Sequence, residues 1–144
     1  MKLRLYFIPI LSFVSLSCID QGEPADWLPK QQLWESLNIH NYSIVQRLDC
    51  FCAGGGRNVR VEVRADTIFS VTAIDTLPWP IQLDYYFTIE SLFLQIQQAN
   101  AVPGAYFRVT YNPEYGYPEY FYFDRIPGAV DDEIGIRTSN LTAQ

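Results

Sequence analysis

Two cysteines one residue apart, Cys50 and Cys52, are the residues of this 144-residue chain whose spacing most directly suggests chemistry. Three glycines follow them, at positions 54–56. On a strand, residues two apart point to the same face, so we expect both thiols to face the core. Their Cα atoms would lie about 6.5–7 Å apart in an extended strand, so a disulfide requires the chain to bend there.

We predict a structural disulfide between Cys50 and Cys52, because the glycines allow the bend and an oxidising compartment favours the bond. Two alternatives remain open. The cysteines are reduced and pack as small core residues, or they form a redox pair, although redox pairs usually have a C-x-x-C at a helix N-terminus. We expect no metal, because zinc needs four ligands and His40 is the only histidine.

His40 lies beside Asn38 and Asn41 at the predicted end of a helix, where we expect a cationic or capping role. The chain has no G-x-S-x-G, P-loop or G-x-G-x-x-G motif, the signatures of acyl transfer and nucleotide binding. We therefore predict no catalytic residues and no cofactor, and expect that the protein is not an enzyme. Catalysis by carboxylates alone stays open, because acids distant in sequence can converge in a fold.

Nine tyrosines and phenylalanines lie in residues 105–124. In the strand predicted there, Tyr120 and Tyr122 alternate with phenylalanines, so both faces of the strand are aromatic. One face belongs to the core. The other is covered by a helix or is a tyrosine surface that binds a peptide or a sugar. Tyr115 and Tyr117, in the preceding turn, either join that surface or pack over the turn.

Asp131, Asp132 and Glu133 form an acidic run before the last predicted strand. Such carboxylates can hold calcium or act as a catalytic pair, but adjacent acids are more typical of a solvated turn. We keep Asp131 and Asp132 as candidate binding residues beside the four tyrosines.

The elements that position these residues follow from periodicity. Helical spacing predicts a helix that starts at the cap Asp26 and ends by Asn38–Asn41, and a second helix that is capped by Thr88 and stopped by Pro103. Alternation predicts strands at 41–52, 58–64, 67–73, 105–111, 119–124 and 134–141, with a loop at 74–87. We predict an α+β fold: an antiparallel sheet of about six strands with two helices on one face, in the order α-β-β-β-α-β-β-β.

The first residues have the pattern of a secretory signal. Residues 1–17 carry two cations and then a short apolar run, and Cys18 closes that run as in the lipobox of bacterial lipoproteins. We expect lipidation at Cys18, a tether over residues 18–26 and one globular domain over 27–144. The alternatives are a soluble exported protein and an uncleaved anchor.

Charge disfavours a nucleic-acid partner. Loss of residues 1–17 removes Lys2 and Arg4 and takes the net charge from −6 to −8. Arg57, Arg60 and Arg64 cluster, but nucleic-acid binding needs a dominant basic face. We expect no nucleic acid among the partners.

Several short segments occur together in an order that resembles a known family. They are "NYS" (41–43), "CFC" (50–52), "VRVEV" (59–63), "TIESLF" (88–93), "YNPEYGYP" (111–118) and "DDE" (131–133). In that order they resemble small exported bacterial proteins and lipoproteins catalogued as a domain of unknown function (number 6174), over about residues 27–141. One departure is "ADT" (65–67), where a "DG" turn is expected. The resemblance implies an exported location and the fold class. It adds no catalytic residues, because the family has no assigned activity.

Together these patterns predict a non-catalytic interaction or structural module in the bacterial cell envelope. We expect it to be exported and lipid-anchored, with a protein, peptide or glycan as partner; the alternative location is secreted and soluble. Two alternative functions remain open. One is a thiol–disulfide protein that uses Cys50 and Cys52, and the other is a glycan- or peptide-binding protein that uses the tyrosine strand.

Overall fold

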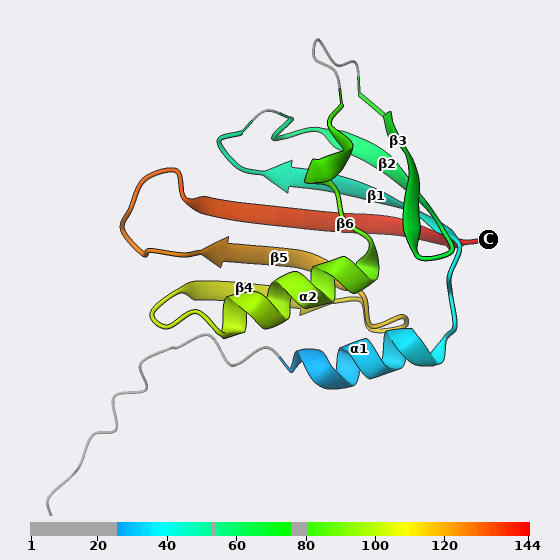
Figure 1. The fold of residues 1–144 in the computed structure, drawn as a ribbon, viewed down its shortest axis with the longest axis horizontal. Coiled ribbons are helices and arrows are strands. Elements are labelled where there is room, and N and C mark those ends of the chain that lie inside the picture. Colours follow the sequence, from blue (N-terminus) through cyan, green and yellow to red (C-terminus); the bar gives the residue numbers. More distant parts are fainter. Residues whose placement is uncertain (1–25, 53, 76–80) are drawn as a thin grey trace, which may run out of the picture.

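A six-stranded sheet and two helices make up the protein in a computed structural model that describes residues 26–52, 54–75 and 81–144 (Figure 1). The predicted signal (1–17) and Cys18 lie outside the described residues. In chain order the elements are α1 (Trp27–Ser36), β1 (Tyr42–Asp49), β2 (Asn58–Arg64), β3 (Thr67–Ala73), the 3-10 helix η1 (Leu83–Tyr85), α2 (Ile89–Asn100), β4 (Tyr106–Tyr111), β5 (Pro118–Asp124) and β6 (Glu133–Ala143).

All strand pairs are antiparallel, and the strands lie in one sheet in the order β3-β2-β1-β6-β5-β4. Two meanders, β1–β2–β3 and β4–β5–β6, meet where β1 pairs with β6 (Figure 1). The sheet and two helices agree with the α+β prediction. The predicted order differs in one element, because η1 lies in the segment that was expected to be only a loop.

The core lies between the sheet and α2. Alternate residues of β2 (Val59, Val61 and Val63) are fully buried, as their period of two predicts. α2 packs against β4 and β5, and α1 packs against α2. α1 also touches the β4–β5 turn, where Gly116 lies against the Lys30 carbonyl. α1 also reaches the sheet through its buried Trp34, whose ring meets the Tyr42 ring of β1 edge to face at 5.4 Å. The two helices therefore adjoin each other on the same face of the sheet.

α2 confirms the clearest sequence prediction. The Thr88 side chain accepts a hydrogen bond from the Ser91 backbone N–H (3.1 Å), which caps the helix. Two hydrogen bonds from one side chain of β1 then hold the start of α2 against the sheet. The buried Gln46 amide donates to the Phe87 carbonyl (2.6 Å) and accepts from the Phe87 N–H (3.0 Å). This pairing satisfies backbone groups that would otherwise be buried without partners.

Several predicted boundaries were wrong. β1 ends at Asp49, so the strand predicted over 41–52 was too long. The end of α1 at Ser36 agrees with the prediction that it ends by Asn38–Asn41, and Asn38 has a positive φ of 51° that interrupts helical geometry. Within the described part of the chain, the predicted cap residue Asp26 makes no side-chain capping hydrogen bond. Packing and turn geometry determine where these elements begin and end, and neither can be inferred from the periodicity of the sequence.

The "ADT" segment forms the two-residue turn between β2 and β3. Arg64 pairs with Thr67, and the two residues between them, Ala65 and Asp66, have φ values of 46° and 61°. Positive φ at both positions defines a type I′ turn, which matches the twist of a hairpin. The departure from "DG" therefore leaves the turn type unchanged.

Candidate functional site

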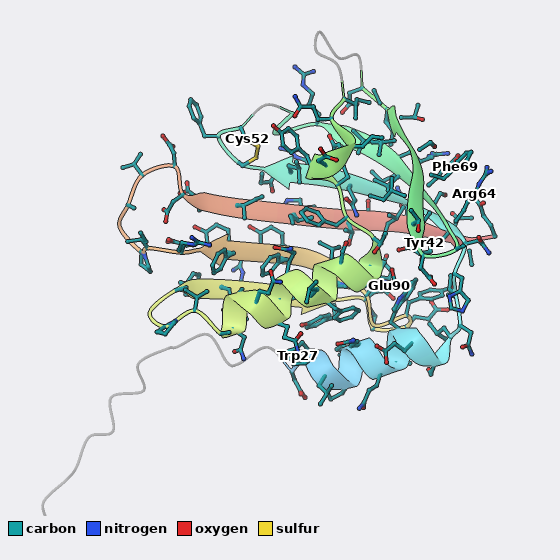
Figure 2. All side chains as sticks on the ribbon, viewed as in Figure 1. Trp27, Tyr42, Cys52, Arg64, Phe69 and Glu90 are labelled. Carbon is teal, nitrogen blue, oxygen red and sulfur yellow. A yellow bond between two sulfur atoms is a disulfide. The ribbon has the colours of Figure 1, made fainter. Side chains whose placement is uncertain are left out.

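The face of the sheet opposite α2 is covered by no helix of the described chain, and we call it the open face. Tyr120 pairs with Arg137 and Tyr122 with Gly135 on this face, while Phe121, between them, is buried on the other. Figure 2 shows side chains on both sides of the ribbon. Of the two outcomes kept open for these tyrosines, the structure favours a surface over cover by a helix.

Tyrosines and arginines alternate across β4, β5 and β6 on the open face. The Arg137 guanidinium lies 4.3 Å from the Tyr120 ring centre, and Arg108 lies 5.4 Å from it. Tyr106 and Tyr122 meet edge to face at 6.0 Å. Cation–π contacts of this kind hold arginine side chains in place at a surface. We call these five residues the open-face cluster.

Asp49 fixes two arginines beside that cluster. Its Oδ1 lies 2.9 Å from Arg47 Nε and its Oδ2 lies 2.6 Å from Arg137 Nε. Each guanidinium has five N–H donors, so these bonds leave its terminal Nη groups to other partners. The arginine side chains remain substantially exposed, at 44% for Arg47 and 56% for Arg137.

A hollow of about 300 Å³ lies next to Arg47 and Arg137, the two arginines paired with Asp49. Its lining is rich in hydrogen-bonding groups and includes Arg47, Asn58, Glu119, Arg137 and Ser139. The hollow and the open-face cluster share Arg137, so together they form a continuous polar and aromatic surface.

Most of the positively charged side chains of the described chain lie on this face. Eight lysines and arginines lie in the described part of the chain, and strand register places five of them on the open face. These five are Arg47, Arg60, Arg64, Arg108 and Arg137. The net charge of the whole chain, −6, did not predict this segregation.

Tyr115 and Tyr117 do not belong to the open face. Tyr117 is 4% exposed, and its ring meets the buried Trp34 of α1 edge to face at 6.5 Å. Tyr115 packs beside it at 6.4 Å. Two outcomes were open for Tyr115 and Tyr117, which could join the surface of Tyr120 and Tyr122 or pack over the turn. The structure divides them into a pair that docks α1 and a pair, Tyr120 and Tyr122, on the open face.

The acidic turn lies at the opposite end of β5 from Tyr115 and Tyr117. The Asp132 carboxylate accepts a hydrogen bond from the Ile126 backbone N–H (2.9 Å) and so closes its own loop. Asp131 has a φ of 65° and is exposed. This geometry is that of a structural turn, and it does not bring Asp131 and Asp132 together with the tyrosine pair of the β4–β5 turn.

Cys50 and Cys52 lie in a bend after β1. Their sulfur atoms are paired and their Cα atoms are 5.3 Å apart, so the chain bends as a disulfide requires. The Gly56 N–H donates to the Leu48 carbonyl (2.6 Å) and closes the bend. Cys52 is exposed, which corrects the expectation that both thiols face the core, because β1 ends before them.

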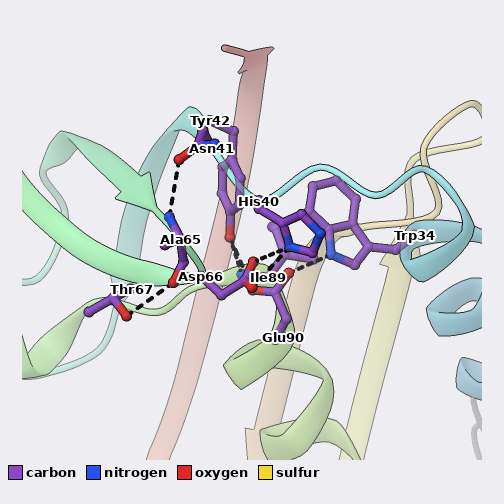
Figure 3. Close-up of polar contacts among 9 residues, drawn as sticks. All are labelled: Trp34, His40, Asn41, Tyr42, Ala65, Asp66, Thr67, Ile89 and Glu90. Carbon is purple, nitrogen blue, oxygen red and sulfur yellow. Dashed lines mark hydrogen bonds and ion pairs between the residues drawn. The ribbon is translucent and has the colours of Figure 1, made fainter.

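A second cavity, of about 190 Å³, lies between α1, α2 and the β2–β3 turn. His40 Nδ1 lies 2.9 Å from Asp66 Oδ2 in its wall, and both side chains are about half exposed. Figure 3 shows this pair beside Glu90 and Trp34. His40 therefore has a hydrogen-bonding partner from the turn, whereas a cationic or capping role at the helix end was expected.

Glu90 is held by two neutral donors in the same wall. The Trp34 indole donates to Oε1 (2.7 Å) and the Tyr42 hydroxyl donates to Oε2 (3.3 Å). The Tyr42 oxygen also accepts from the Ile89 backbone N–H (2.7 Å), so it links sheet and helix (Figure 3). Burial, and then the charge of Glu90, raise the pKa of Tyr42 well above its usual value near 10.

One family model covers nearly the whole described chain. Its description is "Family of unknown function (DUF6174)", and it matches residues 26–143. The chain belongs to this family. The resemblance found from the sequence segments is thereby confirmed as to the family. No significant match was found among curated proteins or among solved structures.

The DUF6174 chain thus holds functional candidates that sequence analysis missed. Trp34 and Glu90 are 56 residues apart and meet only through the docking of α1 on α2. The arginines did carry a signal: Arg60 and Arg64 alternate with buried valines in β2, which predicts a basic strand face. The net negative charge of the whole chain nevertheless led to the expectation that no basic surface is dominant.

Membrane-spanning helices and metal sites were both considered for the described residues of this DUF6174 chain, residues 26–52, 54–75 and 81–144. None of their helices is long and apolar enough to cross a membrane. Within the same residues, no three histidines, cysteines or acids are grouped so that they could hold a metal ion.

Proposed function

We propose that this DUF6174 chain is an exported, lipid-anchored and non-catalytic module of the bacterial cell envelope, which binds its partner through the open face. One observation carries this proposal. The open face presents tyrosines and fixed arginines that the fold does not need for its core. Tyrosine offers a large contact area with a polar tip, and arginine a rigid fork of donors, which suits recognition.

The cavity beside His40 is the best candidate for an active site in the described chain. It has a His–Asp pair and a held carboxylate, the parts of a general base. Its lining residues include no Ser, Thr, Cys or Lys to act as a nucleophile. The tight link of Glu90 to Trp34 and Tyr42 supports a structural role, so we assign the function to the open face.

Site-specific photocrosslinking in the native host tests the surface. A photoreactive residue at position 122, on the open face, should give a discrete adduct. The matched control is position 97, because Gln97 is exposed on α2. An adduct from position 97 and none from position 122 would show that the partner contacts the helical side and would overturn the proposal.

Anchoring has its own test. Metabolic labelling with a fatty-acid analogue should mark the full chain but not the Cys18→Ala variant. Equal labelling of both proteins would refute lipidation at Cys18 and favour the soluble exported alternative.

A thiol–disulfide function is the second candidate, because Cys52 is exposed. We propose that the Cys50–Cys52 pair is structural and oxidised in the envelope. The bond closes a very short loop, so we expect the Cys50→Ser, Cys52→Ser double variant to fold and to lose only about 1–2 kcal/mol. Thiol titration of the unreduced, denatured protein should find no free thiol at these positions. Two free thiols would argue for the redox candidate.

A further inference from the structure

We propose that the ligand of the open face is an anionic polysaccharide, whose carboxylate groups bind Arg47 and Arg137 while its sugar rings lie along Tyr122 and Tyr106. This deepens the proposed function and rests on it, because it states which partner chemistry the open face takes.

Charge segregation is the first step. The chain is acidic as a whole, with a net charge of −6, yet five of the eight cations in its described part lie on one sheet face. Asp49 and Glu62 lie among them, Glu119 lines the hollow beside Arg47 and Arg137, and Asp124 and Glu133 lie together at one end of the face. Cations and acids are therefore equal in number on this face, whereas the rest of the surface is acidic, so the open face is the part of the molecule that repels an anion least.

The geometry of the two central arginines is the second step. Asp49 engages the Nε of Arg47 and of Arg137, one on each oxygen. The terminal Nη groups beyond those bonds match the two oxygens of a carboxylate. Tyr120 stacks against Arg137 at 4.3 Å and further limits its motion. Such pre-organisation lowers the entropy lost on binding.

The aromatic part of the face favours a sugar. Both Arg137 and Arg108 pack on Tyr120, so this ring serves to position them. Tyr122 and Tyr106 form the next pair outward and are partly exposed. Tyrosine rings bind the apolar faces of sugars, and their hydroxyl groups bind sugar hydroxyls. The hollow next to Arg137 adds the Asn58 and Ser139 side chains. Glu119 also lines it, and its carboxylate accepts a hydrogen bond from the Asn112 side chain (2.8 Å).

Backbone pairing disfavours a peptide at this place. Peptides that bind by strand addition need the free backbone groups of an edge strand. Arg47, Tyr122 and Arg137 lie on β1, β5 and β6, which are interior strands paired on both sides. Only side chains are offered here, so recognition depends on their charges, rings and hydroxyls.

An anionic membrane surface also fits the face poorly. Membrane-surface binding usually combines basic charge with apolar side chains that insert. Among the exposed large apolar residues of the described chain, Phe69 and Tyr106 are the ones on the open face. Arg64 lies over the Phe69 ring at 3.7 Å, so its ring is already covered on one side.

Affinity electrophoresis of the purified full chain in detergent tests this assignment. We expect polygalacturonate, a uronic acid polymer, to retard the protein, and uncharged dextran not to. Retardation should weaken as salt rises, because charge pairs at a surface are screened. Arg137→Gln and Arg47→Gln should each weaken binding by about tenfold, as expected for a lost charge-assisted pair.

The matched control is Arg125→Gln, because Arg125 is exposed in the β5–β6 loop and not on the open face. It should bind as the wild type does. Arg137→Lys keeps the charge but not the fork, so it should recover only part of the affinity. Tyr122→Ser should weaken binding to the polymer more than to free galacturonate, since stacking along the chain is lost.

Three outcomes would overturn the polysaccharide assignment: equal retardation by dextran, an equal loss in the Arg125→Gln control, or tighter binding to phosphatidylglycerol vesicles or a poly-glutamate peptide than to polygalacturonate. These failures are distinguishable from failure of the proposed function. If polygalacturonate does not bind but the crosslink from position 122 persists, the open face has another partner. If that crosslink is also absent, the open-face function itself is wrong.

Discussion

Ala65 has a backbone conformation that suits glycine or asparagine. Its φ of 46° is costly for a residue with a Cβ, by about 1–2 kcal/mol. We predict that Ala65→Gly raises the free energy of unfolding by about 0.5–1 kcal/mol, because relief of strain exceeds the added chain entropy. Urea unfolding followed by circular dichroism measures the change.

The matched control for this prediction is Ala105→Gly, since Ala105 has no positive φ. There the substitution only loosens the unfolded chain, so stability should fall slightly. A loss of stability in both variants would contradict the assignment of strain to the turn.

The Tyr42 hydroxyl links β1 to the start of α2. In Tyr42→Phe the Ile89 N–H loses its acceptor and Glu90 loses a donor. A buried donor without a partner costs about 1–3 kcal/mol, and we predict a loss of that size. Tyr85→Phe, at a ring that is 39% exposed, should change little. Equal effects of the two variants would show that the hydroxyl link contributes nothing.

At the scale of elements, Gly116 determines how α1 docks on the β4–β5 turn. A Cβ at this position would lie 2.6 Å from the Lys30 carbonyl oxygen, and φ is +78°. We predict that Gly116→Ala costs about 2–4 kcal/mol, which combines backbone strain with displacement of α1. Chemical denaturation gives the value, and amide hydrogen exchange of α1 reports the displacement.

Gly128→Ala separates the two contributions. Gly128 also has a positive φ, of +96°, but nothing lies within 4 Å of the added Cβ. It should therefore show only the cost of strain. If both alanine variants lose the same stability, the contact between α1 and the turn is unimportant.

The elements differed in how far sequence could predict them. α2 and β2 were predicted well because each carries its own period and, for α2, its own cap. The end of β1 was not, since residues 50–52 continue an apolar pattern while the Gly56-to-Leu48 hydrogen bond bends the chain. Local pattern cannot report a bend that depends on a bond formed eight residues later.

At the scale of the whole molecule, alkaline pH should weaken the fold. Burial raises the pKa of Tyr42, Tyr111 and Tyr117 above the usual value near 10. In the unfolded chain these phenols lose their protons first, so above pH 10 the unfolded state binds fewer protons and is favoured. We predict that the urea midpoint falls between pH 9 and pH 11.

Tyr42→Phe should make this fall with pH shallower, because one of the titrating groups is removed. The same urea titrations in both proteins provide the comparison. A midpoint that stays constant or rises over this interval would contradict the assignment of buried, neutral phenols.

The candidate surface was only partly predictable. Alternation in β5 correctly separated Tyr120 and Tyr122 from the phenylalanines beside them. The contacts of Tyr120 with Arg108 and Arg137 require β4 and β6 to lie on either side of β5. The order of the strands in the sheet could not be predicted from the sequence. The net charge of the chain also gave no sign that the arginines gather on one face, because that placement depends on the strand register.

The pairing of β1 with β6 has a consequence for biogenesis. Each meander consists of neighbouring hairpins, but this central pairing joins residues such as Asp49 and Arg137, 88 positions apart. Closing so long a loop is slow compared with forming hairpins. Until it closes, β1 and β6 are both unpaired edges, open to the complementary strand of another newly made copy. Domain-swapped dimers, with β6 exchanged between copies, are therefore the misassembly to which this topology is most exposed.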